Sequence, residues 1–219
     1  MPARYNRATP STLSAEDSER LHMIGSSQRH LFYSILRLGL PCPVATSMRS
    51  MNGHEDGLIS LRVAEANDDV RQAVRVPMRK PYRTLLGHFR NEIDHFYFQQ
   101  LVETSDMLEE TRRVFGDERD DYATALKTSF QNRPPSNWPE HFISTYASCH
   151  LSEDFAECRA HYFHIAGAGE SARAFGVSID PKTHQDLETQ VRFNPYRASS
   201  AQQFVDAWMP ISLALNPLP

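Results

Sequence analysis

Apolar and polar residues alternate along this chain mainly with the period of an α-helix. In residues 28–40 (QRHLFYSILRLGL), Leu31, Ile35 and Leu38 recur at spacings of four and three. This spacing places the three side chains on one face of a helix. Pro41 follows, and a proline cannot continue the helix. The segment is therefore predicted to be an amphipathic helix that ends before Pro41.

A longer helical pattern covers residues 81–102, with Pro81 in the first turn, where a helix does not need its missing N–H. The apolar residues occupy one broad face: Leu85, Leu86, Phe89, Ile93, Phe96 and Tyr97. A polar stripe lies opposite and consists of His88, Asn91, Glu92, His95 and Gln99. Because the stripe is flanked by apolar residues such as Phe98, we expect the helix to be buried nearly all round and the stripe to line a cleft. A solvated polar face is the alternative interpretation.

Shorter patterns predict the remaining elements. Residues 58–64 (LISLRVA) alternate with period two, which favours a strand. Further helices are expected over 117–130, over 153–166 and beyond about 202. Ser152 is the expected N-cap of the second of these helices, with Gly167 and Gly169 at its end.

These patterns predict a mainly α (α+β) fold with a small β-sheet and a long central helix. The first 27 residues are polar and contain two prolines and several Ser and Thr. We expect residues 1–27 to form a mobile arm, with a helix beginning near Ser14, and residues 28–219 to form a single domain.

The composition and net charge exclude several classes of protein. The 219 residues are 40% hydrophobic and 23% charged, which is ordinary for a soluble globular protein. A net charge of -4 argues against a nucleic-acid partner. No apolar run approaches a membrane span and the first residues lack the apolar core of a secretory signal, so we expect a cytoplasmic protein. Three scattered cysteines exclude a disulfide framework and a cysteine-rich zinc ribbon.

The polar stripe contains the sequence NEIDH at residues 91–95. In the metallopeptidase motif HExxH, two histidines on one helix face bind a zinc ion and the glutamate is the general base. Glu92 and His95 occupy two of these positions, and Asn91 stands where the first histidine belongs. By itself this signal is weak, since Glu-x-x-His often occurs by chance. His88 and His95 are about 10 Å apart along a helix, too far to share one ion.

The predicted helix over 153–166 strengthens the case for a metal site. Glu153, Glu157 and His164 share one face, with His161 at its margin. Glu153 can supply a carboxylate to a His-His-Glu site. Glu157, one turn later, can hold a ligand in place by a hydrogen bond. An exposed charged face is the alternative interpretation.

At this point the sequence resembles a bacterial family of zinc-binding metallopeptidases. The family signature reads approximately RTLLGHFRHExGHYYW and then SAYASxHPWEDWAExWAHYLHI. This chain has RTLLGHFRNEIDHFYFQQL at 83–101 and STYASCHLSEDFAECRAHYFHI at 144–165. Three further stretches are similar: LFYSILRLGLP, DGLISLRVAEAND and FGDERDDYATAL. The similarity covers about residues 28 to 176 and keeps the motif order.

The resemblance implies a gluzincin-like, zincin-fold domain that hydrolyses peptide bonds with a zinc-activated water. It implies that Glu92 is the general base, that His95 is a zinc ligand and that Glu153 is the third ligand. Tyr146 lies seven residues before Glu153, the spacing of an oxyanion-donating tyrosine in lethal-factor-like metallopeptidases; a core tyrosine is the alternative. We expect His88, Glu157 and His161 to surround the ligands.

This chain departs from the family pattern at the metal. Asn91 replaces the first histidine, Asp94 replaces a glycine and Leu151-Ser152 replaces Pro-Trp, and the family's N-terminal zinc ribbon has no counterpart here. A neutral amide oxygen is a poor zinc donor, so we expect zinc to be weakly bound or lost. Replacement of the missing ligand could come from three residues, His88, Cys149 or His150, although nothing in the sequence places them at the metal.

Three hypotheses follow. The first is an impaired zinc-dependent hydrolase that acts on a peptide or protein. The second is an inactive metallopeptidase fold, a pseudoenzyme, that serves as a binding or regulatory module. The third is a structural domain with no retained site.

Overall fold

The computed structural model describes residues 14–43, 45–49, 53–55, 58–76, 84–132 and 134–216, and these are mainly helical. The helices are α1 (Ala15–Leu38), α2 (Asp68–Arg75), α3 (Leu85–Phe98), α4 (Leu108–Phe115), α5 (Tyr122–Gln131), α6 (Trp138–His141), α7 (Leu151–Ala174) and α8 (Ala201–Leu215). The strands are β1 (Ala45–Arg49), β2 (Gly53–Glu55), β3 (Leu58–Arg62), β4 (Ser178–Ile179) and β5 (Thr189–Gln190). The predicted mainly α fold with a small sheet is confirmed.

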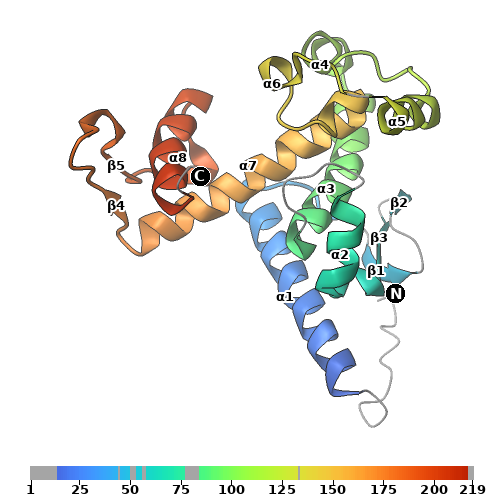
Figure 1. Ribbon diagram of the computed structural model, residues 1–219, viewed down its shortest axis with the longest axis horizontal. Coiled ribbons are helices and arrows are strands. Elements are labelled where there is room, and N and C mark those ends of the chain that lie inside the picture. Colours follow the sequence, from blue (N-terminus) through green and yellow to red (C-terminus); the bar gives the residue numbers. More distant parts are fainter. Residues whose placement is uncertain are drawn as a thin grey trace.

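The two sheets are small. In the first, β3 lies between β1, to which it is parallel, and β2, to which it is antiparallel. Ile59 of β3 is fully buried in the core that α1 and α3 share. The strand predicted at 58–64 is therefore β3, followed by a short 3-10 helix, η2 (Val63–Ala66). In the second sheet, β4 and β5 form a short antiparallel pair near α8 (Figure 1).

The central layer is the pair α3 and α7, with α1 beside them (Figure 1). Phe89 and Ile93 of α3 pack in one buried cluster with Ile35 of α1 and Phe163 of α7. Each of these four side chains is fully buried. Since truncating a buried phenylalanine to alanine costs about 3–5 kcal/mol, this cluster fixes how α3 lies on α7.

The predicted helix over 81–102 is α3, extended by a π-helical turn, η3 (Gln99–Glu103). Thr84 caps it, because its hydroxyl accepts the N–H of Gly87 at 3.0 Å. Most of the helix is buried, including polar residues of the stripe, as the flanking apolar residues predicted. Pro81 lies outside the described residues.

The helix that was expected to begin near Ser14 is present as α1, which starts at Ala15 and has Ser14 as its N-cap. Residues 15–27 belong to α1, so the expected boundary at residue 28 lies inside a helix. Ser14 accepts the N–H of Asp17 as N-cap, and Ile24 is buried in the α1–α3 core. A cap and a buried side chain therefore continue the helix upstream of the boundary. Residues 1–13 lie outside the described part of the chain.

The ends of α7 also differ from the prediction. The N-cap is His150, not Ser152, because the His150 ring accepts the Ser152 N–H at 3.1 Å. Gly167 and Gly169 do not end the helix, which continues to Ala174. A Cβ on Gly169 would lie 3.1 Å from Cγ of Pro195. A glycine is therefore favoured at position 169 because the segment that carries Pro195 lies close against α7.

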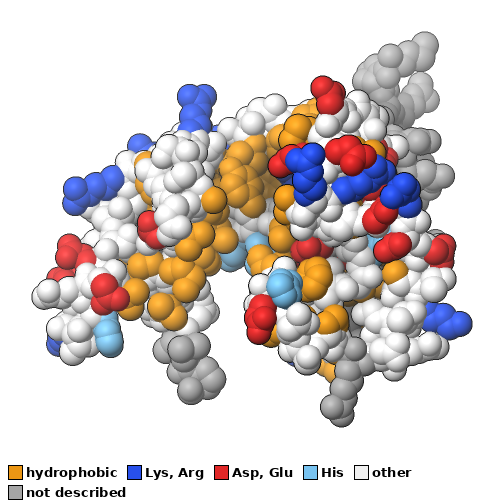
Figure 2. All heavy atoms as spheres, turned by 90° about the horizontal axis from the view of Figure 1, so that it is seen from above, with side chains coloured by type: hydrophobic (Ala, Val, Ile, Leu, Met, Phe, Trp, Pro, Cys, Tyr) orange, Lys and Arg blue, Asp and Glu red, His pale blue; other side chains and the backbone are white. Residues whose placement is uncertain are grey.

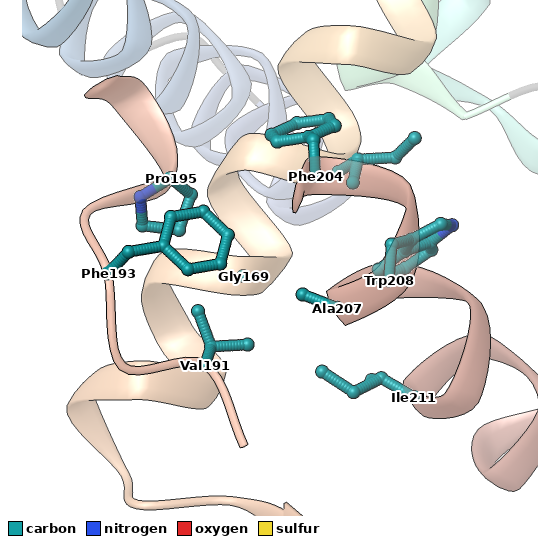
Figure 3. A pocket seen from close by; sticks show the side chains of 9 residues that line it. Gly169, Val191, Phe193, Pro195, Phe204, Ala207, Trp208 and Ile211 are labelled. Carbon is teal, nitrogen blue, oxygen red and sulfur yellow. The ribbon is translucent and has the colours of Figure 1, made fainter. Parts of the chain in front are cut away.

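The C-terminal part of the chain packs on the far end of α7. Val191, Ala207 and Ile211 form a buried apolar cluster with Ala172 of α7. Phe193 and Pro195 lie opposite Trp208 across a narrow apolar gap (Figure 3). This packing positions α8 beside the C-terminal half of α7.

Candidate functional site

His95 of α3 and Glu153 of α7 face each other where the two helices meet. His95 Nε2 lies 3.8 Å from Glu153 Oε2. The Glu153 side chain is 2% exposed and the His95 side chain 24% exposed. Glu153 Oε2 has no hydrogen-bond partner in the part of the chain that the structure describes. The two residues that the sequence predicted as metal ligands are thus brought together, beside a buried oxygen whose bonding capacity is unused.

Two tyrosines hold the other side of the Glu153 carboxylate. The Tyr122 hydroxyl donates to Glu153 Oε1 at 2.5 Å, and Tyr146 also hydrogen-bonds the carboxylate. Burial, and then the negative charge of Glu153, raise the pKa of both phenols above the usual value. Both therefore remain protonated donors.

The predicted stabiliser Tyr146 accordingly reaches the site, but it contacts the carboxylate of a predicted ligand. Tyr122 was missed by sequence reasoning, although it lies in the stretch FGDERDDYATAL that resembles the family. Nothing in its spacing connected a residue of α5 to one that follows 31 positions later.

Asn91 belongs to a different hydrogen-bond network. Its Nδ2 donates to Glu157 Oε1 at 3.2 Å, and Ser144 Oγ donates to Glu157 Oε2 at 3.1 Å. All three residues are buried. Glu157 therefore holds the side chain at position 91 by a hydrogen bond, the role that the sequence predicted for it toward a ligand.

The remaining predicted residues lie around these groups. His88 Nε2 is 3.6 Å from Glu92 Oε1, with both side chains largely buried. His161 Nδ1 is 2.7 Å from the main-chain oxygen of Glu157. His150 serves the cap of α7, and its Nε2 lies 3.1 Å from the main-chain oxygen of Asp120. His150 is therefore not a replacement for the missing ligand.

The donor set does not fit a three-ligand zinc centre. Among the described residues, no group of three His, Cys, Asp or Glu could hold a metal ion. His95 and Glu153 supply an imidazole and a carboxylate, two of the three donors that zinc needs. At the third position the Asn91 amide N–H₂ is directed to Glu157, and only its neutral oxygen is left as a donor.

Asp94, the replacement for the family's glycine, joins α3 to α7. It is fully buried, and Arg159 Nε donates to its Oδ1 at 2.9 Å. Burial raises the pKa of the Asp94 carboxyl to about 8, and Arg159 opposes the rise. The Arg159 guanidinium also lies over the rings of Tyr97, Phe155 and Phe163. This bridge lies one residue from His95 and stabilises its approach to α7.

A cavity of about 630 Å³ opens beside the Asn91 network, between α3, α7 and α8. Its polar lining includes His88, Arg90, Asn91, Ser144, Glu157, His161 and His164, and its apolar lining includes Ile143, Ile165 and Trp208. Figure 2 shows a hollow between the lobe that carries α8 and the lobe that carries α3, with histidine and apolar side chains at its edge. Two residues of the polar stripe, His88 and Asn91, thus line the cavity, whereas Glu92, His95 and Gln99 are not part of its lining.

Comparison with known proteins identifies the family of this chain. A family model described as "Putative zinc-binding metallo-peptidase" matches residues 17–219. The chain belongs to this family. The zinc-binding metallopeptidase family therefore accounts for nearly all of the described structure, including α1 upstream of the expected boundary.

The chain is also similar to three curated mycobacterial proteins. Three such proteins, from Mycobacterium bovis and from two strains of Mycobacterium tuberculosis, are each 42% identical over 166 residues. The match covers 75% of this chain and 46% of each relative. The chain thus spans less than half the length of these relatives, whose names describe them only as uncharacterized. No solved structure matches. In the described residues no helix has the length and apolarity to cross a membrane.

Proposed function

We propose that this chain is a metallopeptidase-like protein in which Asn91 has impaired zinc binding and, with it, peptide-bond hydrolysis. The observation that carries the proposal is the bond from Asn91 Nδ2 to Glu157. A histidine at this position would give one ring nitrogen to Glu157 and the other to the metal. Asparagine keeps the first contact and offers no imidazole for the second.

The other expected catalytic and ligand residues are present, which supports descent from an active metallopeptidase. His95 and Glu153 lie together, Glu92 precedes His95 by three residues on the same helix, and Tyr146 is beside Glu153. Zinc, where bound, would acidify a water molecule. We infer that the partner is a peptide or protein in the cytoplasm.

The test compares the natural chain with Asn91→His, both purified without chelator. We expect far less than one zinc per natural chain and little cleavage of casein. In Asn91→His we expect about one zinc per chain, with casein cleavage that a chelator blocks and that Glu92→Gln abolishes in the same background. Stoichiometric zinc and chelator-sensitive cleavage in the natural chain would contradict the proposal.

A second candidate is a binding module that no longer hydrolyses. It is favoured by the cavity, whose polar lining is intact although the metal position is degenerate. Peptide binding by the natural chain in the presence of chelator, without cleavage, supports this candidate. Binding that requires added zinc supports the impaired enzyme.

A further inference from the structure

We propose that His95, Tyr122, Tyr146 and Glu153 together form a binding site for ferric iron, a hard trivalent cation. The inference goes beyond the proposed function, although it shares His95 and Glu153 with it. It gives no part to Asn91 and requires no hydrolysis.

The first support is that four side chains able to bind a metal meet at one carboxylate. Tyr122 Oη donates to Glu153 Oε1 at 2.5 Å. Tyr146 hydrogen-bonds both the Glu153 carboxylate and the Tyr122 phenol. On the other side, His95 Nε2 lies 3.8 Å from Glu153 Oε2. Two donors that each lie about 2 Å from one ion are about 3–4 Å apart, so the imidazole and the carboxylate already have such a separation.

The second support is a buried anionic oxygen whose bonding capacity is unused. The Glu153 side chain is 2% exposed, and its Oε2 has no hydrogen-bond partner among the residues that the structure describes. The His95 ring at 3.8 Å is too distant for a hydrogen bond. Burial of a charged oxygen without a partner is costly. A cation bonded to Glu153 Oε2 removes this cost.

The third support is the chemistry of the donor set. The absence of a three-residue metal group in the described part of the chain concerns His, Cys, Asp and Glu, so it does not include the tyrosines. Charged oxygen donors favour hard cations, and a tyrosine oxygen is a known ligand of iron in proteins. Ferric iron therefore suits two phenolates and a carboxylate better than zinc does.

The charges of this donor set also balance those of ferric iron. The Glu153 carboxylate and the two phenolates carry three negative charges, and the ion carries three positive ones. The filled site is then neutral, which lowers the cost of its burial. A divalent cation on the same anionic set would leave one negative charge uncompensated.

Binding exchanges two protons for the ion. In the metal-free chain the Tyr122 phenol donates its proton to Glu153. Ligation requires the anionic form, so each phenol releases its proton to solvent as its oxygen bonds the metal. The iron enters and stays as the ferric ion, so no electron is transferred.

Helix α5 provides a path of entry. It begins with Tyr122 and lies beside the end of α7 that carries Glu153 (Figure 1). None of its residues, all of which the structure describes, is buried, and Tyr122 is 41% exposed. The His95 side chain is 24% exposed. A small ion can therefore reach Glu153 by displacing a surface ring, without unpacking the core.

The test loads the natural chain, first stripped of metal, with one equivalent of ferric nitrilotriacetate. We expect about one iron per chain after desalting. We also expect a purple colour from phenolate-to-iron charge transfer, together with tyrosinate vibrations in the resonance Raman spectrum. Absence of retained iron would overturn the proposal. Retained iron without the tyrosinate signature would also overturn it, because the ion would then be bound elsewhere.

Two matched substitutions locate the site. Tyr122→Phe removes one phenol oxygen and should lose at least about tenfold in iron affinity, as the loss of an outer-shell partner of a metal ligand already does. Tyr33→Phe is the control, because the Tyr33 hydroxyl also donates to a glutamate, Glu170, at 2.8 Å but at the surface. It should keep the natural iron affinity and colour. Undiminished affinity and colour in Tyr122→Phe would contradict the site.

Circular dichroism checks the folding of both variants. If Tyr122→Phe fails to fold, the resonance Raman spectrum of the iron-loaded natural chain still decides, because it reports phenolate ligation without any substitution.

The two proposals fail separately. Failure of Asn91→His to take up zinc would overturn the proposed cause of impairment and leave the ferric colour of the natural chain unaffected. A natural chain that takes up no iron, beside an Asn91→His variant that takes up zinc, would overturn the ferric site alone.

Discussion

At the scale of single residues, one substitution separates two hydrogen-bond systems. Glu153 is held by Tyr122 and Tyr146 and faces His95, whereas Glu157 is held by Asn91 and Ser144. A histidine at position 91 would join the two systems through a shared metal. Asparagine keeps the Glu157 system satisfied, whereas one oxygen of Glu153 has no hydrogen-bond partner among the described residues.

Glu157→Leu tests the second of these systems. The substitution leaves the buried Asn91 amide and Ser144 hydroxyl without their acceptor, and each buried unsatisfied group costs about 1–3 kcal/mol. We expect the free energy of unfolding in urea to fall by about 2–4 kcal/mol. Glu170→Leu, which removes a carboxylate that bonds Arg37 and Tyr33 at the surface, is the control and should cost less. Equal losses in the two variants would show that the buried Glu157 hydrogen bonds stabilise the fold no more than the surface hydrogen bonds of Glu170.

His164 should make stability depend on pH. Its side chain is partly exposed, and partial desolvation followed by the charge of Arg90 lowers its pKa in the folded chain, so the folded state binds fewer protons than the unfolded state. This contribution is complete above the unfolded pKa of about 6.5 and is lost as the pH falls below it. We expect His164→Gln to lose less stability than the natural chain between pH 7 and pH 5 in urea titrations. A natural slope in His164→Gln would contradict the prediction.

At the scale of elements, the central helix α3 was the element that the sequence predicted best. The one-sided apolar spacing predicted the helix α3, because a buried amphipathic helix shows its faces in sequence. Of the polar stripe that was expected to line a cleft, only His88 and Asn91 line the cavity. Apolar periodicity did not predict where α7 begins and ends. Gly169 resembles a residue that ends a helix. Glycine is instead needed there because Pro195, which is 26 residues later in the sequence, lies against α7 and leaves little room for a side chain.

Two glycines of α7 give a matched pair of substitutions. Gly169→Val should clash with Pro195, whose Cγ would lie 3.1 Å from the new Cβ, and should destabilise the chain by about 1–3 kcal/mol. At Gly167 the nearest atoms would lie 3.7 Å away, an ordinary contact. Gly167→Ala should therefore be neutral or stabilise by up to about 1 kcal/mol, because alanine favours helix. Thermal unfolding of both variants checks the pair, and equal loss in both would refute the role of Pro195.

Other elements could not be predicted from their own residues. β1 (ATSMR) has no apolar alternation that would predict a strand; its strand depends on the parallel pairing with β3. Tyr122 was missed for a related reason, since its partner Glu153 belongs to another helix. Contacts between residues far apart in the sequence, unlike helix periodicity, cannot be recognised from the local order of apolar and polar residues.

At the scale of the whole molecule, α7 connects two lobes. One end packs against α3 and carries Glu153 and Glu157, and the other end carries the C-terminal cluster of Val191, Ala207 and Ile211 (Figure 1). The cavity lies where α8 approaches α3 across α7. Residues of both lobes line this cavity, whereas His95 of α3 and Glu153 of α7 face each other outside its lining.

The central claim is that Asn91 is the reason for weak zinc binding. The most direct measurement is the zinc dissociation constant of the natural chain and of Asn91→His, by competition with a chromophoric chelator at one pH. We predict at least a hundredfold tighter binding in Asn91→His, about the effect of adding one imidazole ligand to two existing donors. Equal affinities, whether tight or weak, would contradict the account.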